Sequence, residues 1–180
     1  MNKVTFKITF SSICIALGIV LPFLTGQIPE IGAMLLPMHI PVLICGYICG
    51  WKYGLIVGFI TPLLRSVSFG MPPLYPTALA MSFELAAYGF ICGFLFNILK
   101  NKINMIISIY GTLIAALIIG RIVWGVVRFG IGIIDQTNVF NFQLFMTGAI
   151  LSCWPGIIIQ LLLVPAVIIS LDKLKLLKKL

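Results

Sequence analysis

The sequence predicts an all-α membrane protein, a bundle of six transmembrane helices with both chain ends on the same side. Of its 180 residues, 61% are hydrophobic and 9% are charged, which is more apolar surface than a soluble globule of this size can bury. Several apolar runs approach the roughly 20 residues that a helix needs to cross a bilayer. All nine lysines lie in short polar breaks between these runs or at the termini, where the positive-inside rule places them.

Six apolar segments make up the single predicted domain, 1–180. They cover about 6–25, 38–50, 53–70, 78–99, 103–130 and 143–171. The first could be mistaken for a signal peptide, but it is long and lacks a small-x-small cleavage signal, so we interpret it as a span. The second is short, and Pro37 and Pro41 interrupt its entrance, which favours a tilted crossing, a thinned bilayer or a preceding re-entrant loop.

The lysines also predict the orientation of the bundle. If the N-terminus is cytoplasmic, six crossings place every lysine inside and make the C-terminus cytoplasmic as well. These residues are Lys3, Lys7, Lys52, Lys100, Lys102, Lys173, Lys175, Lys178 and Lys179. The net charge of +8 is therefore explained by the lysines that orient the bundle in the membrane. It does not indicate nucleic-acid binding, and we predict no nucleic-acid partner. The outer connections, about 26–37, 70–77 and 131–142, contain no Lys or Arg, and the first two are rich in Pro and Gly, as adaptable ligand-binding loops would be.

The three arginines and one acid, Glu84, lie within or at the edge of apolar runs instead. A charged residue at the bilayer centre costs roughly 2.5 to 3.5 kcal/mol on insertion scales, so it usually faces a polar cavity or a partner. Counting about 1.5 Å per residue from the nearest lysine places Arg65, Glu84 and Arg121 about 20 to 28 Å up, in the outer half. His39 and Trp154 fall in the same band, which predicts a binding site there.

Helical spacing groups several of these residues. Arg121, Trp124 and Arg128 share a face at i, i+3 and i+7, and Glu84 and Tyr88 share one at i+4. If both faces point inward, they line a cavity that opens outward, with flat aromatic walls. Three cations against one acid favour a ligand that carries a carboxylate or another anionic group. The predicted substrate-binding residues are Arg65, Glu84, Tyr88, Arg121, Trp124, Arg128, Trp154 and His39.

Structural alternatives remain open for five of them. Arg128 lies beyond the expected span and would suit a headgroup anchor, and Trp154 would suit an interfacial aromatic belt. Arg65 and Glu84 would also form a structural ion pair between the third and fourth spans. His39 would cap or hydrogen-bond near the start of the second span, and no second ligand accompanies it at metal-binding spacing. We therefore predict no metal and no cofactor.

Small residues predict two close packing faces. A glycine recurs every four residues from Gly46 to Gly58, which predicts a tight hairpin of the second and third spans. Ser12 and Ala16 form a second small-xxx-small face on the first span. That face would either pack internally or dock another membrane subunit.

Two stretches carry a family resemblance. LPMHIPVLICGYICGWKYGLIVGFITPLLRS (residues 36–66) includes H-x-P-x-L and K-x-G-x-x-x-G, and FGMPPLYPTALAMSFELAAYGFICGFL follows it (69–95). With the six-span plan and the length, they make the chain resemble the S components of energy-coupling factor (ECF) transporters. These are the substrate-binding subunits of bacterial and archaeal vitamin importers.

The resemblance implies a subunit in the bacterial cell membrane that binds a small water-soluble vitamin or precursor at its outer end. It implies closure by the loop from Ile28 to Pro37, and docking through Ser12 and Ala16 onto a coupling subunit, T, driven by two cytoplasmic ATPases. The family usually has Ala-xxx-Ala where this chain has Ser-xxx-Ala. Pantothenate is our first candidate ligand, because its carboxylate would suit the arginines.

Other function classes fit less well. The chain contains no G-x-x-x-x-G-K-[ST] phosphate loop for ATP hydrolysis and no Ser/His/Asp set or facing pair of acids, so we do not expect an enzyme. A self-sufficient transporter or channel would need a polar route to the inner face. Between the outer layer and the lysines we find few polar residues besides Gln160, Thr112 and Ser108, which disfavours that alternative.

Overall fold

The computed structural model describes residues 2–25, 28–135, 141–148 and 152–173, and within them it is helical without strands. The predicted all-α class is therefore confirmed. Four stretches of the described chain are long and apolar enough to cross a membrane: Lys3–Thr25, Leu74–Leu99, Met105–Ile134 and Trp154–Lys173. Of the expected features, residues 136–140 and 149–151 and the lysines after Lys173 lie outside the described residues.

The order of the elements along the chain follows the sequence prediction closely, with additions between the long helices. The elements are α1 (Lys3–Val20), η1 (Leu21–Thr25), α2 (Pro29–Leu35), α3 (His39–Cys49), α4 (Trp51–Phe69), η2 (Leu74–Ala78), α5 (Leu79–Leu99), α6 (Met105–Ile134), α7 (Phe142–Met146) and α8 (Trp154–Lys173). The segment expected as one helix over 143–171 is instead divided into α7 and α8. The expected connection at 26–37 contains the short helix α2.

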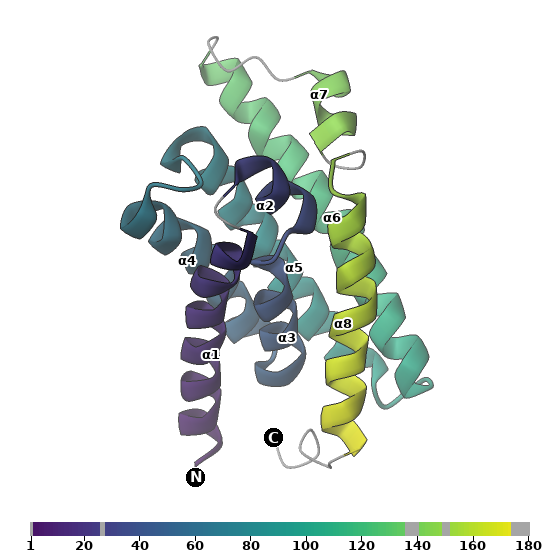
Figure 1. The fold of residues 1–180 in the computed structure, drawn as a ribbon. Helices are drawn as coiled ribbons and strands as arrows, with labels where there is room; N and C mark the ends of the chain where they lie inside the picture. The colour runs from purple at the N-terminus through teal and green to yellow at the C-terminus, as the bar shows by residue number, and fades with distance from the viewer. Residues whose placement is uncertain (1, 26–27, 136–140, 149–151, 174–180) are drawn as a thin grey trace.

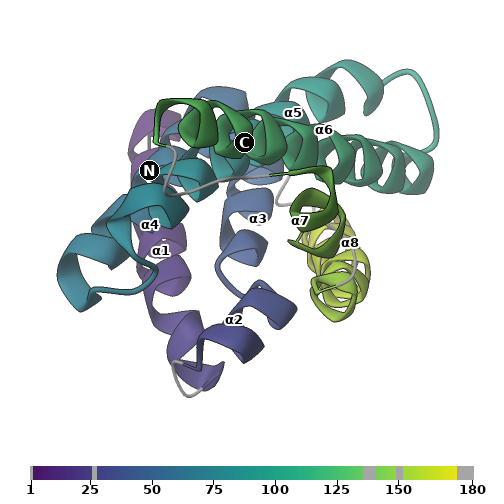
Figure 2. The ribbon, with the colours of Figure 1, turned by 90° about the horizontal axis from the view of Figure 1, so that it is seen from above.

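Helix α3 is the centre of the bundle. It contacts α1, α4, α5 and α8, and Figure 2 shows it inside the group of longer helices. Nine of its 11 residues are buried, so an otherwise short apolar helix is covered by protein along most of its length. Tyr47 ties it to α6: the hydroxyl donates to the Ile109 carbonyl at 2.8 Å and lies 2.7 Å from Thr112 Oγ1.

Glycines allow α3, α4 and α5 to pack backbone against backbone. A Cβ at Gly54 would lie 2.8 Å from Gly46 Cα and 2.6 Å from the Gly89 carbonyl oxygen, and one at Gly58 would collide with the backbone of α5. The tight hairpin of α3 and α4 is thus confirmed, and α5 joins it as a third partner. Gly50 forms the turn between α3 and α4 with φ +91°, a conformation that disfavours residues with a Cβ.

The bundle has two ends with different chemistry. The start of α1, the α3–α4 turn, the α5–α6 connection and the end of α8 lie at the lower end in Figure 1. We call this the lysine end, because it carries Lys3, Lys7, Lys52, Lys100, Lys102 and Lys173. Helices α2 and α7 and the connection between α4 and α5 lie toward the opposite end.

Candidate functional site

A cavity of about 580 Å³ lies toward the end opposite the lysines. We call it the upper cavity. Residues of η1, α2, α3, α4, η2, α5, α6 and the turn before α8 line it, so segments far apart in the sequence meet there. Most of the lining is apolar, and His39, Arg65, Glu84 and Arg121 are its ionisable side chains besides Cys153. Five of the predicted site residues therefore share one cavity: His39, Arg65, Glu84, Arg121 and Trp124.

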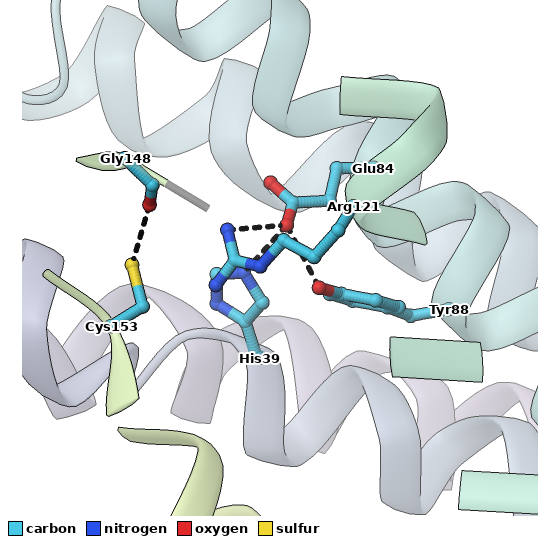
Figure 3. Close-up of polar contacts among 6 residues, drawn as sticks. All are labelled: His39, Glu84, Tyr88, Arg121, Gly148 and Cys153. Atoms are coloured by element: carbon cyan, nitrogen blue, oxygen red, sulfur yellow. Dashed lines mark hydrogen bonds and ion pairs between the residues drawn. The ribbon is translucent and has the colours of Figure 1, made fainter. Parts of the chain in front are cut away.

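Glu84 is the centre of the polar cluster in Figure 3. Its Oε1 lies 2.8 Å from Arg121 Nη1, accepts a hydrogen bond from the Tyr88 hydroxyl at 2.8 Å, and lies 3.8 Å from His39 Nε2. The carboxylate is only 1% exposed, so these contacts replace water. One buried charge thus connects α3, α5 and α6 at the wall of the upper cavity.

Tyr88 contacts Glu84 from the protein interior and not from the cavity. It is fully buried and does not line the upper cavity, which corrects the expectation that its ring would form a flat wall. A Cβ at Gly120 would collide with the Tyr88 ring, so the glycine next to Arg121 leaves the space that the ring occupies. The Tyr88 hydroxyl is thereby held against Glu84, where it fixes the orientation of the carboxylate.

Arg65 occupies a different part of the same cavity. Its Nη1 donates to the Ile19 carbonyl at 2.6 Å, and its guanidinium lies 5.1 and 5.9 Å from the ring centroids of Phe23 and Phe69. The proposed Arg65–Glu84 ion pair is wrong, since the arginine that pairs with Glu84 is Arg121. The depth count brought these residues to one level, but the rotation of each helix decides which of them meet.

Some polar atoms in the wall of the cavity make no hydrogen bond to any described residue. Both ring nitrogens of His39 and Nη2 of Arg121 are buried and make no hydrogen bond within the described residues. Buried polar groups are nearly always hydrogen-bonded, so such atoms at a cavity wall point to a ligand or ordered water. Two guanidinium groups against one carboxylate also leave an excess of positive charge. The arrangement suits a ligand with an anionic or acceptor group.

A comparison with known protein families decides the class of the protein. The family model described as ECF transporter, substrate-specific component, matches residues 6–168. The chain belongs to this family. The match confirms the resemblance carried by residues 36–66 and 69–95. No curated protein matches the chain, and no solved structure does.

Of the remaining predicted residues of this ECF substrate-specific component, one lines the cavity and two lie outside it. Trp124 lines the upper cavity and stacks on Phe145 of α7, with 6.3 Å between ring centroids. Trp154 is 60% exposed at the start of α8, and neither it nor Arg128 lines the cavity. The exposure of Trp154 agrees with an interfacial aromatic, whereas Nε and Nη1 of Arg128 are buried, which does not support a headgroup anchor.

Sequence reasoning missed several residues that line the cavity of the ECF component. Met81 and Thr77 precede Glu84 by three and seven positions, so helical periodicity from Glu84 would have found them. Cys153 lies in the wall where Trp154 was expected, and its thiol donates to the Gly148 carbonyl at 3.0 Å. Burial raises the pKa of the Cys153 thiol, which keeps the proton on this donor.

The predicted docking face of the ECF component is on the surface. Ser12 and Ala16 are exposed, whereas Ser11, Cys14 and Gly18 are the residues of α1 that turn inward. The Ser12 hydroxyl donates to the Ile8 carbonyl at 3.0 Å within its own helix. The alternative that this face packs internally is therefore excluded.

Proposed function

We propose that this ECF substrate-specific component captures a small, water-soluble, anionic vitamin or vitamin precursor in the upper cavity. The observation that supports this is the placement of Arg65 and Arg121 with Glu84 in one largely apolar cavity. Its volume of about 580 Å³ is within the roughly 300 to 1,000 Å³ of ordinary small-molecule sites. Pantothenate is the first candidate, since an arginine binds a carboxylate through two parallel hydrogen bonds.

The loop that contains α2 would close over the bound vitamin. Ile28, Gly32, Leu36 and Pro37 line the upper cavity, so a ligand there would contact this segment directly. Helix α2 rests on α8, because a Cβ at Gly156 would lie 2.7 Å from the Met34 carbonyl oxygen. Release of the ligand would require this contact and the loop to move together.

The proposed topology has six crossings, both termini in the cytoplasm and the upper cavity facing outward, in the bacterial cell membrane. The four long apolar stretches would be joined by α4, with 19 residues, and by the short, enclosed α3. The lysine end would then face the cytoplasm, as the positive-inside rule requires. Substituted-cysteine labelling at Lys102 and Phe142 in intact cells tests this: Phe142→Cys should react with an impermeant reagent and Lys102→Cys should not.

Transport would depend on a T subunit and two cytoplasmic ATPases. Ser12 and Ala16 are exposed small residues one turn apart on α1, which allows another helix to approach closely. We expect Ser12→Leu/Ala16→Leu to reduce co-purification with T by about tenfold, as loss of close packing costs on the order of 1.4 kcal/mol or more. The control Ile13→Leu, at a position on the same helix that is 50% exposed, should leave co-purification with T unchanged.

Uptake assays separate this function from that of a self-sufficient transporter. The chain is reconstituted in liposomes alone and with T and the ATPases, and a panel of labelled vitamins is supplied with and without ATP. Binding by the lone chain, with uptake confined to the full complex and ATP, supports the proposal. Uptake by the lone chain without ATP would contradict it and would favour the second function class.

A further inference from the structure

A second cavity lies at the lysine end, far from the candidate substrate site. It measures about 740 Å³ and is lined by parts of α1, α3, α4, α5 and α8 and of the α5–α6 connection. We call it the basal cavity and define it by Lys7, Lys52, Lys100, Trp51, Tyr53 and Asp172. Neither the family assignment nor the proposed substrate site gives it a role.

The basal cavity has an excess of positive charge. Three lysines line it against one acid, Asp172, and within the described residues no carboxylate lies within 4.0 Å of these ammonium groups. Lys52 Nζ lies 5.4 Å from the centroid of the Trp51 ring and Lys7 Nζ lies 5.9 Å from that of Tyr53. Aromatic contacts thus hold two cations at the cavity without neutralising them.

Helices α3, α4 and α5 each have an end at the basal cavity. Helix α4 begins at Trp51 in the cavity wall, and Gly93 of α5 packs so closely that a Cβ there would collide with the Trp51 nitrogen. The first-turn N–H groups of a helix lack intrahelical partners and carry partial positive charge. The C-terminal ends of α3 and α5 lie at the same cavity with the opposite partial charge, so it is the lysines that favour an anion there.

An aromatic strip next to the cavity favours an amphiphile over a free ion. Trp51, at the cavity, is 38% exposed and makes an edge contact with Phe90 at 5.5 Å between ring centroids. Phe90 stacks on Phe94 at 5.5 Å, and Phe94 is 42% exposed. Trp51 and Phe94 are both exposed on the surface of α4 and α5, so the acyl chains of a lipid at the cavity would follow this strip.

We propose that the basal cavity binds the phosphate headgroup of an anionic phospholipid from the leaflet at the lysine end, with the acyl chains against Trp51, Phe90 and Phe94. Lys7, Lys52 and Lys100 supply the cations that the phosphodiester requires. Basic pockets between membrane helices are suited to such headgroups. The proposal does not depend on which molecule occupies the upper cavity.

Binding to the delipidated chain in a neutral detergent tests this directly. The probes are short-chain phosphatidylglycerol, short-chain phosphatidylcholine and inorganic phosphate, each titrated by thermophoresis. Lys52→Gln/Lys100→Gln should weaken phosphatidylglycerol binding by about tenfold or more, since each cation near an anionic lipid contributes to affinity. Lys52→Arg/Lys100→Arg should retain it. The control Lys3→Gln/Lys102→Gln removes the same total charge outside the cavity and should retain it too.

Each contrary result overturns a defined part of the proposal. Equal binding of phosphatidylglycerol and phosphatidylcholine would show that the site does not recognise an anion. Displacement of phosphatidylglycerol by inorganic phosphate at similar concentration would assign the cavity to a soluble anion instead of a lipid. An equal loss in the Lys3→Gln/Lys102→Gln control would show that overall charge, and not the cavity, attracts the lipid. Size-exclusion profiles and melting temperatures like those of the wild type establish that each variant is folded.

Discussion

Replacing Arg121 by glutamine should strongly destabilise the protein, because it removes the arginine that pairs with Glu84. Glu84 is 1% exposed, and Arg121 Nη1 lies 2.8 Å from its Oε1. Removing one partner of a buried ion pair costs about 3 to 5 kcal/mol, since the other charge is left buried. For a chain of this length, that corresponds to a fall in Tm on the order of 10 °C.

A double-mutant cycle distinguishes this ion pair from ordinary packing. The variants are Glu84→Gln, Arg121→Gln and the combination, and thermal unfolding of each is followed in the same detergent. The combined variant has no unpaired charge, so it should recover much of the lost stability, with a coupling of about 2 to 3 kcal/mol. Additive effects of the two single substitutions would show that Arg121 and Glu84 are not coupled, and would refute this reasoning.

Three further substitutions test how the helices are positioned around the cluster. Gly120→Ala should lower the Tm, since overpacking against the Tyr88 ring costs about 1 to 3 kcal/mol; the control Gly111→Ala, which meets open space on the same helix, should leave it unchanged or raise it. Tyr88→Phe should cost about 1.5 to 3 kcal/mol through loss of the hydrogen bond to the Glu84 carboxylate, and an unchanged Tm would contradict that role. Gly58→Ala should separate α4 from α5 and lower the Tm by at least as much as Gly120→Ala, whereas a neutral effect would show that the helices can adjust.

The lysines allowed much of the helix order to be predicted from the sequence. A lysine is costly in hydrocarbon, so Lys52 and Lys100 mark interruptions that the chain must place near water. No charged residue interrupts the apolar sequence before the start of α8. The sequence remains apolar through the turn at Ser152 and Cys153, so hydropathy extended one helix over α7 and α8.

The sequence predicted the height of each site residue along its helix, but not how each helix is rotated about its own axis. The fixed rise of a helix brings Glu84 and Arg121 to one level whatever their neighbours are. Which side chains meet depends on how each helix is turned, and close contacts such as that of Gly120 with Tyr88 set that angle. For this reason, sequence reasoning named Arg65 as an ion-pair partner of Glu84, where the structure has Arg121.

The most direct test of the proposed function is calorimetric titration of the purified lone chain with a panel of water-soluble vitamins that includes pantothenate. Arg121→Lys is titrated in parallel, because lysine keeps a cation beside Glu84 but loses the second guanidinium nitrogen, Nη2. We expect saturable binding of an anionic vitamin by the wild-type chain and about tenfold or more weaker binding by a folded Arg121→Lys variant. Equal affinity in both proteins would contradict the assignment of the upper cavity as an arginine-dependent substrate site.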